Sequence, residues 1–201
     1  MADNIRLEAC SGKDLEKYIP QLASLRIAVF RDFPYLYDGD LDYEEHYLQT
    51  YIDAPDSVMV LAFDGAKVIG AATAIPLRHE THEVKKPFLE HGYNPEEIFY
   101  CGESVLLKDY RGLGIGVRFF QQREAHARQL GGFRYICFCC VERAADHPRR
   151  PDNYVPLDAF WKKRGYRKHP ELQTWYTWKD LDEDQETPKL MTFWLKTVNN
   201  V

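Results

Sequence analysis

A glycine-rich segment in the middle of the chain has the residue types and spacing of an anion-binding loop. Residues 110–116 read Tyr-Arg-Gly-Leu-Gly-Ile-Gly, with glycine at every second position from Gly112 to Gly116. Glycine tolerates positive φ and lets a ligand approach the backbone. The segment leads into a run with helical spacing, so unpaired amides and the positive end of a helix dipole would converge on one point. Together with the guanidinium of Arg111, the loop predicts a diphosphate site.

Two other nucleotide-binding motifs fit this loop less well. A dinucleotide fingerprint would need a third glycine where the chain has Val117, and it normally follows the first strand of a domain. A P-loop would end in Gly-Lys-Ser/Thr, whereas this loop ends in Gly116-Val117-Arg118. A glycine-rich helix start that holds no ligand remains the structural alternative.

The elements that must position the loop form a mixed pattern. Strands are expected at residues 5–9, 58–63, 67–75, 98–107, 134–141 and 172–178, and helices at 11–29, 41–52, 112–130 and 157–164. Residues 77–95 are predicted to be a polar insertion with one helical turn, and residues 191–198 form a last apolar segment, strand or helix. This order is not the regular alternation of a doubly wound sheet, so we expect a different α/β (α+β) fold.

Length and composition favour one globular domain. The 201 residues are 45% apolar, which suffices to bury a core without disulfide or metal support. The net charge of −5 argues against a nucleic-acid partner, because duplex-binding proteins need a concentrated basic face. No apolar run approaches the roughly 18 residues of a membrane span, and residues 1–4 lack the features of a signal peptide. We therefore expect neither a nucleic-acid nor a membrane partner.

The cysteines and histidines do not predict a metal site. In the expected strand Cys137 and Cys139 share one face and Cys140 lies on the other, which is poor geometry for a tetrahedral ion. The three histidines of residues 77–95 have irregular spacing, come without cysteine, and are expected in a surface loop. Five cysteines are best explained as buried, reduced thiols, which predicts a cytoplasmic protein.

Two segments resemble the GNAT superfamily of acetyl-CoA-dependent N-acetyltransferases. The run Arg-Gly-x-Gly-Ile-Gly after Tyr110 is similar to the family's pyrophosphate-binding motif. Residues 159–166, Ala-Phe-Trp-Lys-Lys-Arg-Gly-Tyr, resemble its helix ending in Leu-Tyr-x-Lys-x-Gly-Phe, and the element order from Ile5 to Trp178 resembles the same fold. The resemblance implies a GNAT-like, mostly antiparallel central sheet, flanked by helices and splayed at the cofactor site. It also implies a single N-acetyltransferase domain over residues 1–201, with a core at about 4–180 and a C-terminal extension at 181–201.

The resemblance also implies how acetyl-CoA, the co-substrate, would bind. Backbone groups of Val105, Leu106 and Leu107 would pair with the pantetheine arm, and the Leu106 amide would donate to the thioester oxygen. Asn153, just before the expected helix at 157–164, is a further candidate contact. The diphosphate would be held by the side chain or backbone amides of Arg111, Gly112, Leu113, Gly114, Ile115 and Gly116.

One position departs from the family's pattern. The helix motif usually has a tyrosine four residues before its glycine, where the hydroxyl can protonate the leaving thiolate, and here that residue is Trp161. An indole N–H donates a hydrogen bond but is no acid near neutral pH. We expect Trp161 to pack against the pantetheine arm, with an ordinary core position as the alternative, and Tyr154 or Tyr166 could supply the hydroxyl instead.

Acetyl transfer to an ammonium requires removal of a proton before the nitrogen can attack the thioester. The resemblance implies a carboxylate on or near the strand at 98–107, and Glu103 is the best candidate, as general base or as the group that orients the amine. Glu96 and Glu97 are the reserves. The structural alternative for Glu103 is a buried salt bridge, for example with Arg134.

The expected function is transfer of the acetyl group of acetyl-CoA to a primary amine by direct attack. A small-molecule or peptide amine remains open as acceptor, acceptor choice is expected in residues 30–47 and 77–95, and a homodimer also remains open. The alternative from another class is a catalytically silent CoA-binding regulatory module, which would need the glycine loop but no proton-accepting carboxylate.

Overall fold

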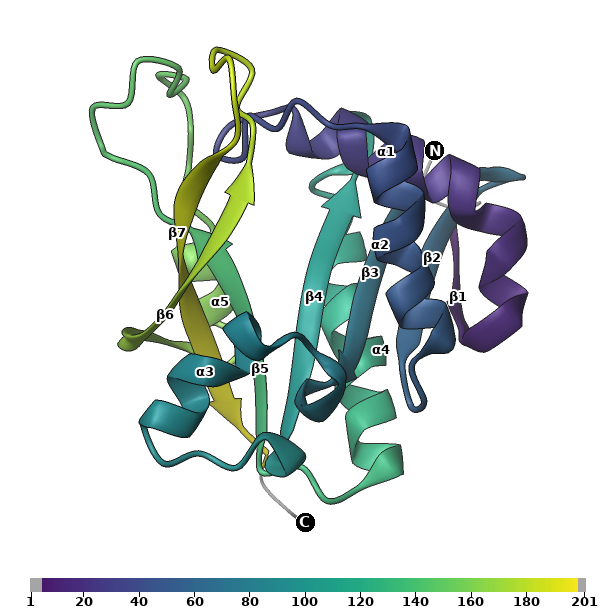
Figure 1. Cartoon of the computed structure of the whole chain (residues 1–201). Coiled ribbons are helices and arrows are strands. Elements are labelled where there is room, and N and C mark those ends of the chain that lie inside the picture. The colour runs from purple at the N-terminus through teal and green to yellow at the C-terminus, as the bar shows by residue number, and fades with distance from the viewer. Residues whose placement is uncertain (1–4, 199–201) are drawn as a thin grey trace.

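The computed structural model describes residues 5–198, which form one seven-stranded sheet covered by helices on both faces (Figure 1). The strand order is β1-β2-β3-β4-β5-β7-β6, and every pair of neighbours is antiparallel except β4 and β5. This confirms the predicted mixed, mostly antiparallel fold. The strands are β1 (Ile5–Cys10), β2 (Val58–Asp64), β3 (Lys67–Pro76), β4 (Ile98–Leu106), β5 (Tyr135–Val141), β6 (Arg167–Trp178) and β7 (Thr187–Thr197).

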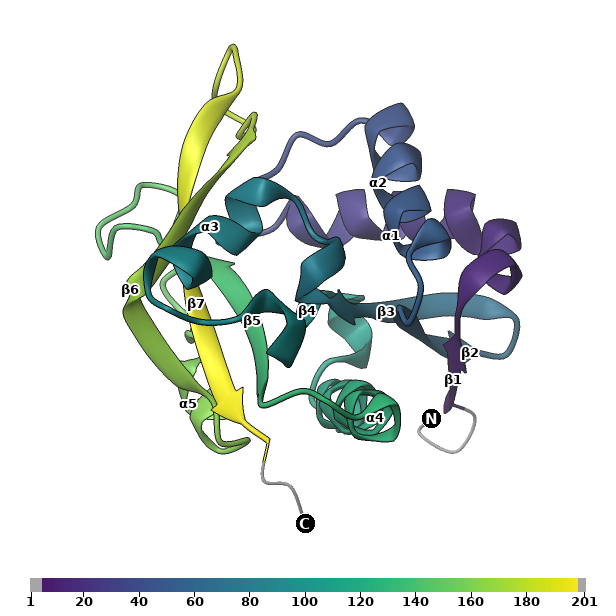
Figure 2. The same ribbon diagram turned by 60° about the horizontal axis from the view of Figure 1, so that its bottom comes forward.

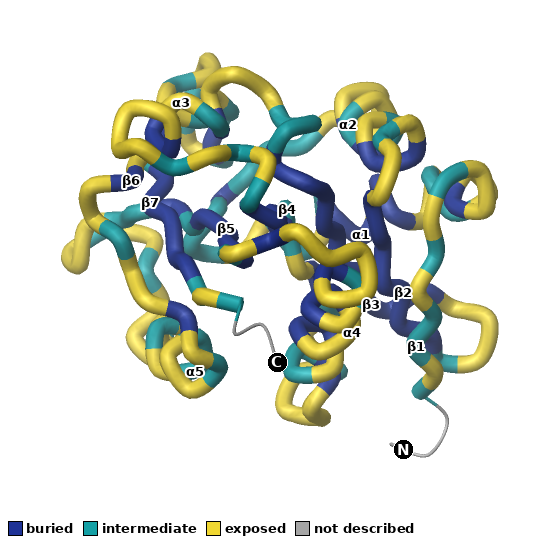
Figure 3. The backbone as a smooth tube through the Cα atoms, turned by 90° about the horizontal axis from the view of Figure 1, so that it is seen from below, coloured by how far each residue is buried: buried dark blue, intermediate teal, exposed yellow. Residues whose placement is uncertain are grey.

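The helices divide between the two faces of the sheet (Figure 2). The helices α1 (Ile19–Phe30), α2 (Leu41–Asp53) and α3 (His82–Glu90) pack on one face, and α4 (Ile115–Leu130) and α5 (Asp158–Lys162) on the other. Each face has its own buried cluster. The strands in the middle of the sheet are therefore buried on both sides, as the dark trace of β2 and β3 shows in Figure 3.

The sheet opens between β4 and β5. These two strands run parallel and pair only where Ile98–Tyr100 meets Tyr135–Cys137. Beyond that point β4 continues to Leu106 beside β3 alone, so its other edge has no strand partner. The two strands diverge upward in Figure 1, which is the expected splay.

Residues 77–95 have more structure than the single helical turn expected. They contain a 3₁₀ turn at Leu77–His79 and the nine-residue helix α3. Val84 and Phe88, one helical turn apart, are buried against the sheet. The polar composition of the segment conceals this short apolar stripe, because the other faces of α3 are exposed.

Residues 181–201 do not lie wholly beyond the core, in contrast to the expected C-terminal extension. They contain β7, which lies between β5 and β6 and pairs with both. Phe193 is buried on one face of the sheet and Trp194 on the other. A strand covered on both faces gives a continuous apolar run rather than an alternating one, so the sequence left open whether this segment is strand or helix.

Candidate active site

The glycine loop ends in a left-handed turn that starts α4. Gly112 and Gly114 have φ values of 82° and 78°, and Gly114 is the N-cap of α4. Because of these two residues the helix begins at Ile115, three residues later than predicted. Gly116 has no positive φ, and a Cβ there would make ordinary contact with the Phe160 ring at 3.4 Å. The first amides of α4 have no acceptor within the helix, which is the arrangement on which the predicted anion site depends.

A cavity of about 1080 Å³ starts at this loop and continues through the splay between β4 and β5. It reaches the C-terminal end of α1, where Val29, Phe30 and Tyr35 form its wall. The structure thus joins the predicted anion site to a second, aromatic end of the same cavity. The predicted site residues that line it are Glu103, Leu106, Arg111, Gly112, Gly114, Ile115, Gly116, Asn153 and Trp161.

Three other predicted residues do not line this cavity. The side chain of Val105 is buried in the core on the α1 face, and that of Leu113 is exposed. The Leu107 amide donates to the Ile69 carbonyl at 3.0 Å. Leu107 therefore directs its backbone toward β3 rather than toward the splay.

The register of β4 determines which backbone groups face the cavity. Antiparallel strands alternate between hydrogen-bonded and non-hydrogen-bonded positions, and the Leu107–Ile69 bond makes position 107 hydrogen-bonded. The backbone groups of Leu106 and Ser104 consequently point away from β3, toward the open edge. The Leu106 carbonyl is held there by Arg111 Nε at 3.3 Å. The Leu106 amide thus faces the open edge, and Ser104 is a cavity residue that the sequence did not indicate.

A β-bulge interrupts the pairing of β3 and β4 beside the cavity. Thr73 pairs with Glu103 and Ile75 with Tyr100, so Cys101 and Gly102 together lie opposite Ala74. Bulges of this kind bend a strand and redirect its side chains. Here the bulge places both Gly102 and Glu103 toward α1 and α2.

The bulge carbonyls are bound by a buried arginine of α4. Arg123 Nη1 donates to the Glu103 carbonyl at 2.8 Å and to the Thr73 carbonyl at 3.2 Å. Arg123 is 1% exposed and also lines the cavity. The sequence did not single it out, yet it falls between Phe119 and Ala127 at four-residue spacing, on the buried stripe of the helix.

The carboxylate of Glu103 forms a buried ion pair. Its partner is Arg26 of α1, which also pairs with Glu44 of α2, and the side chains of all three are less than a tenth exposed. The salt-bridge alternative is therefore correct in kind, but the partner is not Arg134, which pairs with Glu97 at 3.3 Å. Arg26 lies four residues after the buried Leu22, a spacing that marks a cation on an apolar helix stripe.

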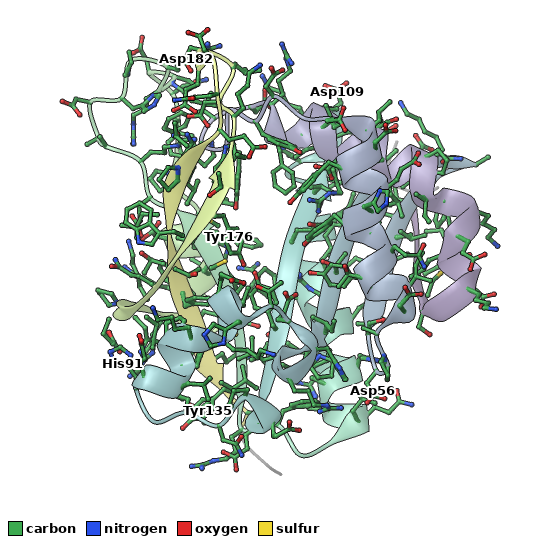
Figure 4. The ribbon with its side chains drawn as sticks, in the orientation of Figure 1. Asp56, His91, Asp109, Tyr135, Tyr176 and Asp182 are labelled. Carbon is green, nitrogen blue, oxygen red and sulfur yellow. The ribbon has the colours of Figure 1, made fainter. Side chains whose placement is uncertain are left out.

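Tyrosines surround this ion pair on the α1–α2 face. The Arg26 guanidinium lies 4.0 Å from the centroid of the Tyr47 ring, and the Tyr47 and Tyr51 hydroxyls are 3.0 Å apart. Burial raises the pKa of Tyr47 to about 12. Tyr176 of β6 lies between the two halves of the sheet in Figure 4, with its hydroxyl 3.1 Å from that of Tyr100. These four tyrosines pack beside the site, but they do not line the cavity.

Trp161 belongs to the cavity and to the core at once. It is half-buried, lines the cavity, and packs its ring against Phe138 and Trp194 at centroid distances of 5.0 and 5.1 Å. Of the two tyrosines considered as substitutes for the missing acid, Tyr154 lines the cavity. The hydroxyl of Tyr166 instead donates to Glu124 at 3.0 Å in the core.

Two distant segments are joined over the aromatic end of the cavity. Arg143, just after β5, forms a bidentate pair with Asp180 at 2.7 and 2.9 Å. The same guanidinium donates to the carbonyls of Pro34 and Tyr35 at 2.7 and 2.8 Å. We call this cluster, formed by residues 34–38, Arg143 and residues 178–183, the roof. Only its first segment lies within the region where acceptor choice was expected.

A mostly antiparallel sheet that opens beside a glycine-rich helix start is the fold of an acetyltransferase. The model of the acetyltransferase (GNAT) family matches residues 22–166, and the chain belongs to this family. Family membership indicates acetyl transfer. No curated protein sequence matches the chain.

Solved structures share the fold at low identity. Arabidopsis thaliana NAA60 in complex with acetyl-CoA is 15% identical, with a TM-score of 0.61 and coverage of 98% of this chain and 99% of that one. A ribosomal-protein-alanine N-acetyltransferase from Brucella melitensis is 13% identical, with a TM-score of 0.61 and coverage of 96% and 99%. An acetyltransferase from Thermus thermophilus is 17% identical, with a TM-score of 0.56 and coverage of 97% of both chains. At these identities the likeness shows the fold alone.

Within residues 5–198, no group of three or more His, Cys, Asp or Glu side chains is arranged to hold a metal ion. None of the helices in that range is both long and apolar enough to cross a membrane.

Proposed function

We propose that the protein is an N-acetyltransferase that transfers the acetyl group of acetyl-CoA to a primary amine by direct attack. The observation that carries this proposal is the continuity of one cavity from the α4 N-terminus, past Leu106, to Glu103, whose carboxylate is held by Arg26. These three features match the three chemical needs of the reaction: an anion site, a donor for the thioester oxygen, and a group that holds the amine. We further propose that the described residues act as a single catalytic domain.

The residues of the chain divide the work along the cavity. Arg111 and the amides of residues 112–116 would bind the diphosphate, and the open edge of β4 at Ser104 and Leu106 would pair with the pantetheine arm. The Leu106 amide would stabilise the oxygen that becomes negative as the amine attacks. Asn153 and Trp161 would line the other side of the bound co-substrate.

We assign Glu103 to orientation of the amine rather than to proton abstraction. A guanidinium beside a carboxylate favours the charged form of the carboxylate, and Arg26 occupies this position next to Glu103. A carboxylate held beside a guanidinium suits an acceptor that arrives as an ammonium. The five free cysteines of the chain support the further proposal that the protein works in a reducing compartment, the cytoplasm.

The test is thiol release from acetyl-CoA over a panel of primary amines, with acetyl-CoA affinity measured separately. We expect turnover with at least one amine, and Glu103→Gln, which would misplace the amine, should lower it by roughly 10²-fold while acetyl-CoA affinity changes little. Binding of acetyl-CoA without turnover on any amine would favour the catalytically silent module instead. Wild-type turnover in Glu103→Gln would move the role to Glu96, Glu97 or solvent.

A further inference from the structure

Arg123 is a buried cation without an acidic partner. Its side chain lies inside the molecule beneath the bulge, with the guanidinium 5.0 Å from the centroid of the Phe120 ring. None of the ion pairs within residues 5–198 includes it, and in that range its Nε has no hydrogen-bond partner. A buried charge that is not paired is strongly unfavourable, so an uncompensated guanidinium needs an explanation.

The titratable groups around Arg123 do not neutralise it. On its own helix the nearest acid is Glu124, which pairs with Lys196 of β7 at 2.8 Å and accepts from Tyr166 at 3.0 Å. On β4, burial raises the pKa of Cys101, so this thiol is uncharged near neutral pH. The carboxylate of Glu103 is paired with Arg26 on the opposite face of the sheet. The positive charge of Arg123 is therefore available to whatever enters the cavity.

The position of Arg123 in the cavity indicates what that ligand is. Arg123 is held against the carbonyl of Glu103, one residue from Ser104 and three from Leu106 on the open edge of β4. Phe138 and Trp161 also line this cavity, so a negative charge formed there would be poorly solvated. Trp161, moreover, occupies the position at which an acid for the leaving group was sought. The chain thus has no acid at that position but places a fixed cation in the same cavity.

We propose that Arg123 stabilises the negative charge that develops on the thioester and then on the departing sulfur. The ammonium first gives one proton to water. In the transfer step the C–N bond forms, the C–S bond breaks and the sulfur keeps the electron pair and leaves as a thiolate, while the nitrogen gives its second proton to water. A fixed cation in a poorly solvated site stabilises such charge without reorganisation. The inference rests on the proposed function, because it concerns the same acetyl-transfer site.

The test uses CoA itself and needs no acceptor. The ultraviolet absorption of the thiolate of bound CoA, followed against pH, gives the pKa of its thiol. A free thiol titrates at about 8.5, and we expect the wild-type protein to lower this pKa by at least about one unit. Arg123→Met should abolish the shift, whereas Arg123→Lys, which retains the charge, should keep part of it. Arg128→Met, on the exposed face of the same helix, is the matched control and should titrate like the wild type.

Desulfo-CoA separates this inference from the proposed function. It lacks the thiol, so its affinity should be the same in the wild type and in all three variants. Failure of the wild type to bind either CoA or desulfo-CoA would overturn the proposed function. Binding of both with an unshifted thiol pKa in the wild type, or with the same shift in Arg123→Met, would overturn the role of Arg123 alone. If Arg123→Met does not fold, the wild-type pKa and Arg123→Lys still decide the question.

Discussion

The two ends of the cavity are built in opposite ways. The anion end is made by backbone from one continuous segment, residues 111–116, and depends on the left-handed turns at Gly112 and Gly114. The aromatic end, where we propose that the acceptor binds and which we call the acceptor end, is made by side chains from segments far apart in the sequence, and it is held by the Arg26 ion pairs and by the roof. Under the proposed function, the anion end would hold the diphosphate, which is the same in every acyl-CoA. The side chains of the acceptor end could change to suit another acceptor without disturbing the sheet.

The largest expected effect is a loss of stability from a substitution at the acceptor end. Arg26→Met removes the only ion-pair partner shown for the buried carboxylates of Glu44 and Glu103, so we expect a loss of about 3–5 kcal/mol in the free energy of unfolding. Denaturant unfolding measures it. The matched variant combines Arg26→Met with Glu44→Gln and Glu103→Gln and should recover most of the loss. No recovery would mean that packing around Tyr47, rather than charge, makes Arg26 necessary.

The next effect tests the anion end. A β-branched residue is strained at φ 78°, so Gly114→Val should displace the first amides of α4 and abolish binding of acetyl-CoA. A ligand at 100 times its Kd stabilises the folded protein by about 2.7 kcal/mol, and thermal unfolding with and without acetyl-CoA should show that this gain is lost.

Gly114→Asn is the control for that experiment. Asparagine visits the left-handed region more readily, and a Cβ at position 114 meets no atom within 4 Å. This variant should therefore keep the fold and part of the ligand shift. A full shift in Gly114→Val would exclude the loop as the binding site.

A smaller effect concerns the place where the two ends meet. A Cβ at Gly102 would lie 2.0 Å from the Tyr51 hydroxyl, so Gly102→Ala must push Tyr51 or the bulge aside. Overpacking of this kind destabilises by about 1–3 kcal/mol. Adding Tyr51→Phe removes the clashing oxygen and should recover part of the loss in denaturant unfolding. If the losses in the free energy of unfolding of the two single variants were simply additive in the double variant, distortion of the bulge rather than the clash with Tyr51 would explain the loss.

The smallest effect is a pH dependence of the roof. Burial opposes ionisation of Glu183, but hydrogen bonds from Lys189, the Asp180 amide and Thr187 outweigh it and lower the pKa to about 2 from 4.5. A lowered pKa in the folded state contributes stability that is present above pH 4.5 and is lost as the pH falls toward 2. Because Glu183 is partly exposed, we expect less than about 1 kcal/mol. Unfolding measured across this range should depend less on pH in Glu183→Gln, and an unchanged slope would contradict the assignment.

The same contrast explains what could be predicted from the sequence. The fold class and the glycine-rich turn that starts α4 were predictable, because strand and helix periodicity and the glycine spacing are local properties of the chain. The partner of Glu103 was not, since Arg26 precedes it by 77 positions in the sequence and meets it only when α1 packs on the bulge. Arg123 was missed for a related reason. An arginine in an amphipathic helix is normally exposed, and the burial of Arg123 becomes evident only from its hydrogen bond to the Glu103 carbonyl of β4.

The roof and α3 also change how acceptor choice can be tested. Shortening residues 77–95 would remove Val84 and Phe88 from the core, so a loss of activity there would not distinguish specificity from stability. Residues 30–47 remain a proposed determinant of acceptor choice. Arg143, however, donates hydrogen bonds both to the carbonyls of Pro34 and Tyr35 and to Asp180. Changes of acceptor preference are therefore expected to involve both segments of the roof together.

The insertion of β7 between β5 and β6 has a consequence for synthesis on the ribosome. β6 has β7 as its neighbour in the sheet, and β5 gains its antiparallel partner from the same strand. While residues 187–197 are still inside the exit tunnel, β6 has no strand to pair with and β5 presents an open edge. The half of the sheet that carries Trp161 and Phe138 can thus close only after translation has passed β7, and until then the nascent chain exposes two unpaired strand edges to chaperones or to other chains.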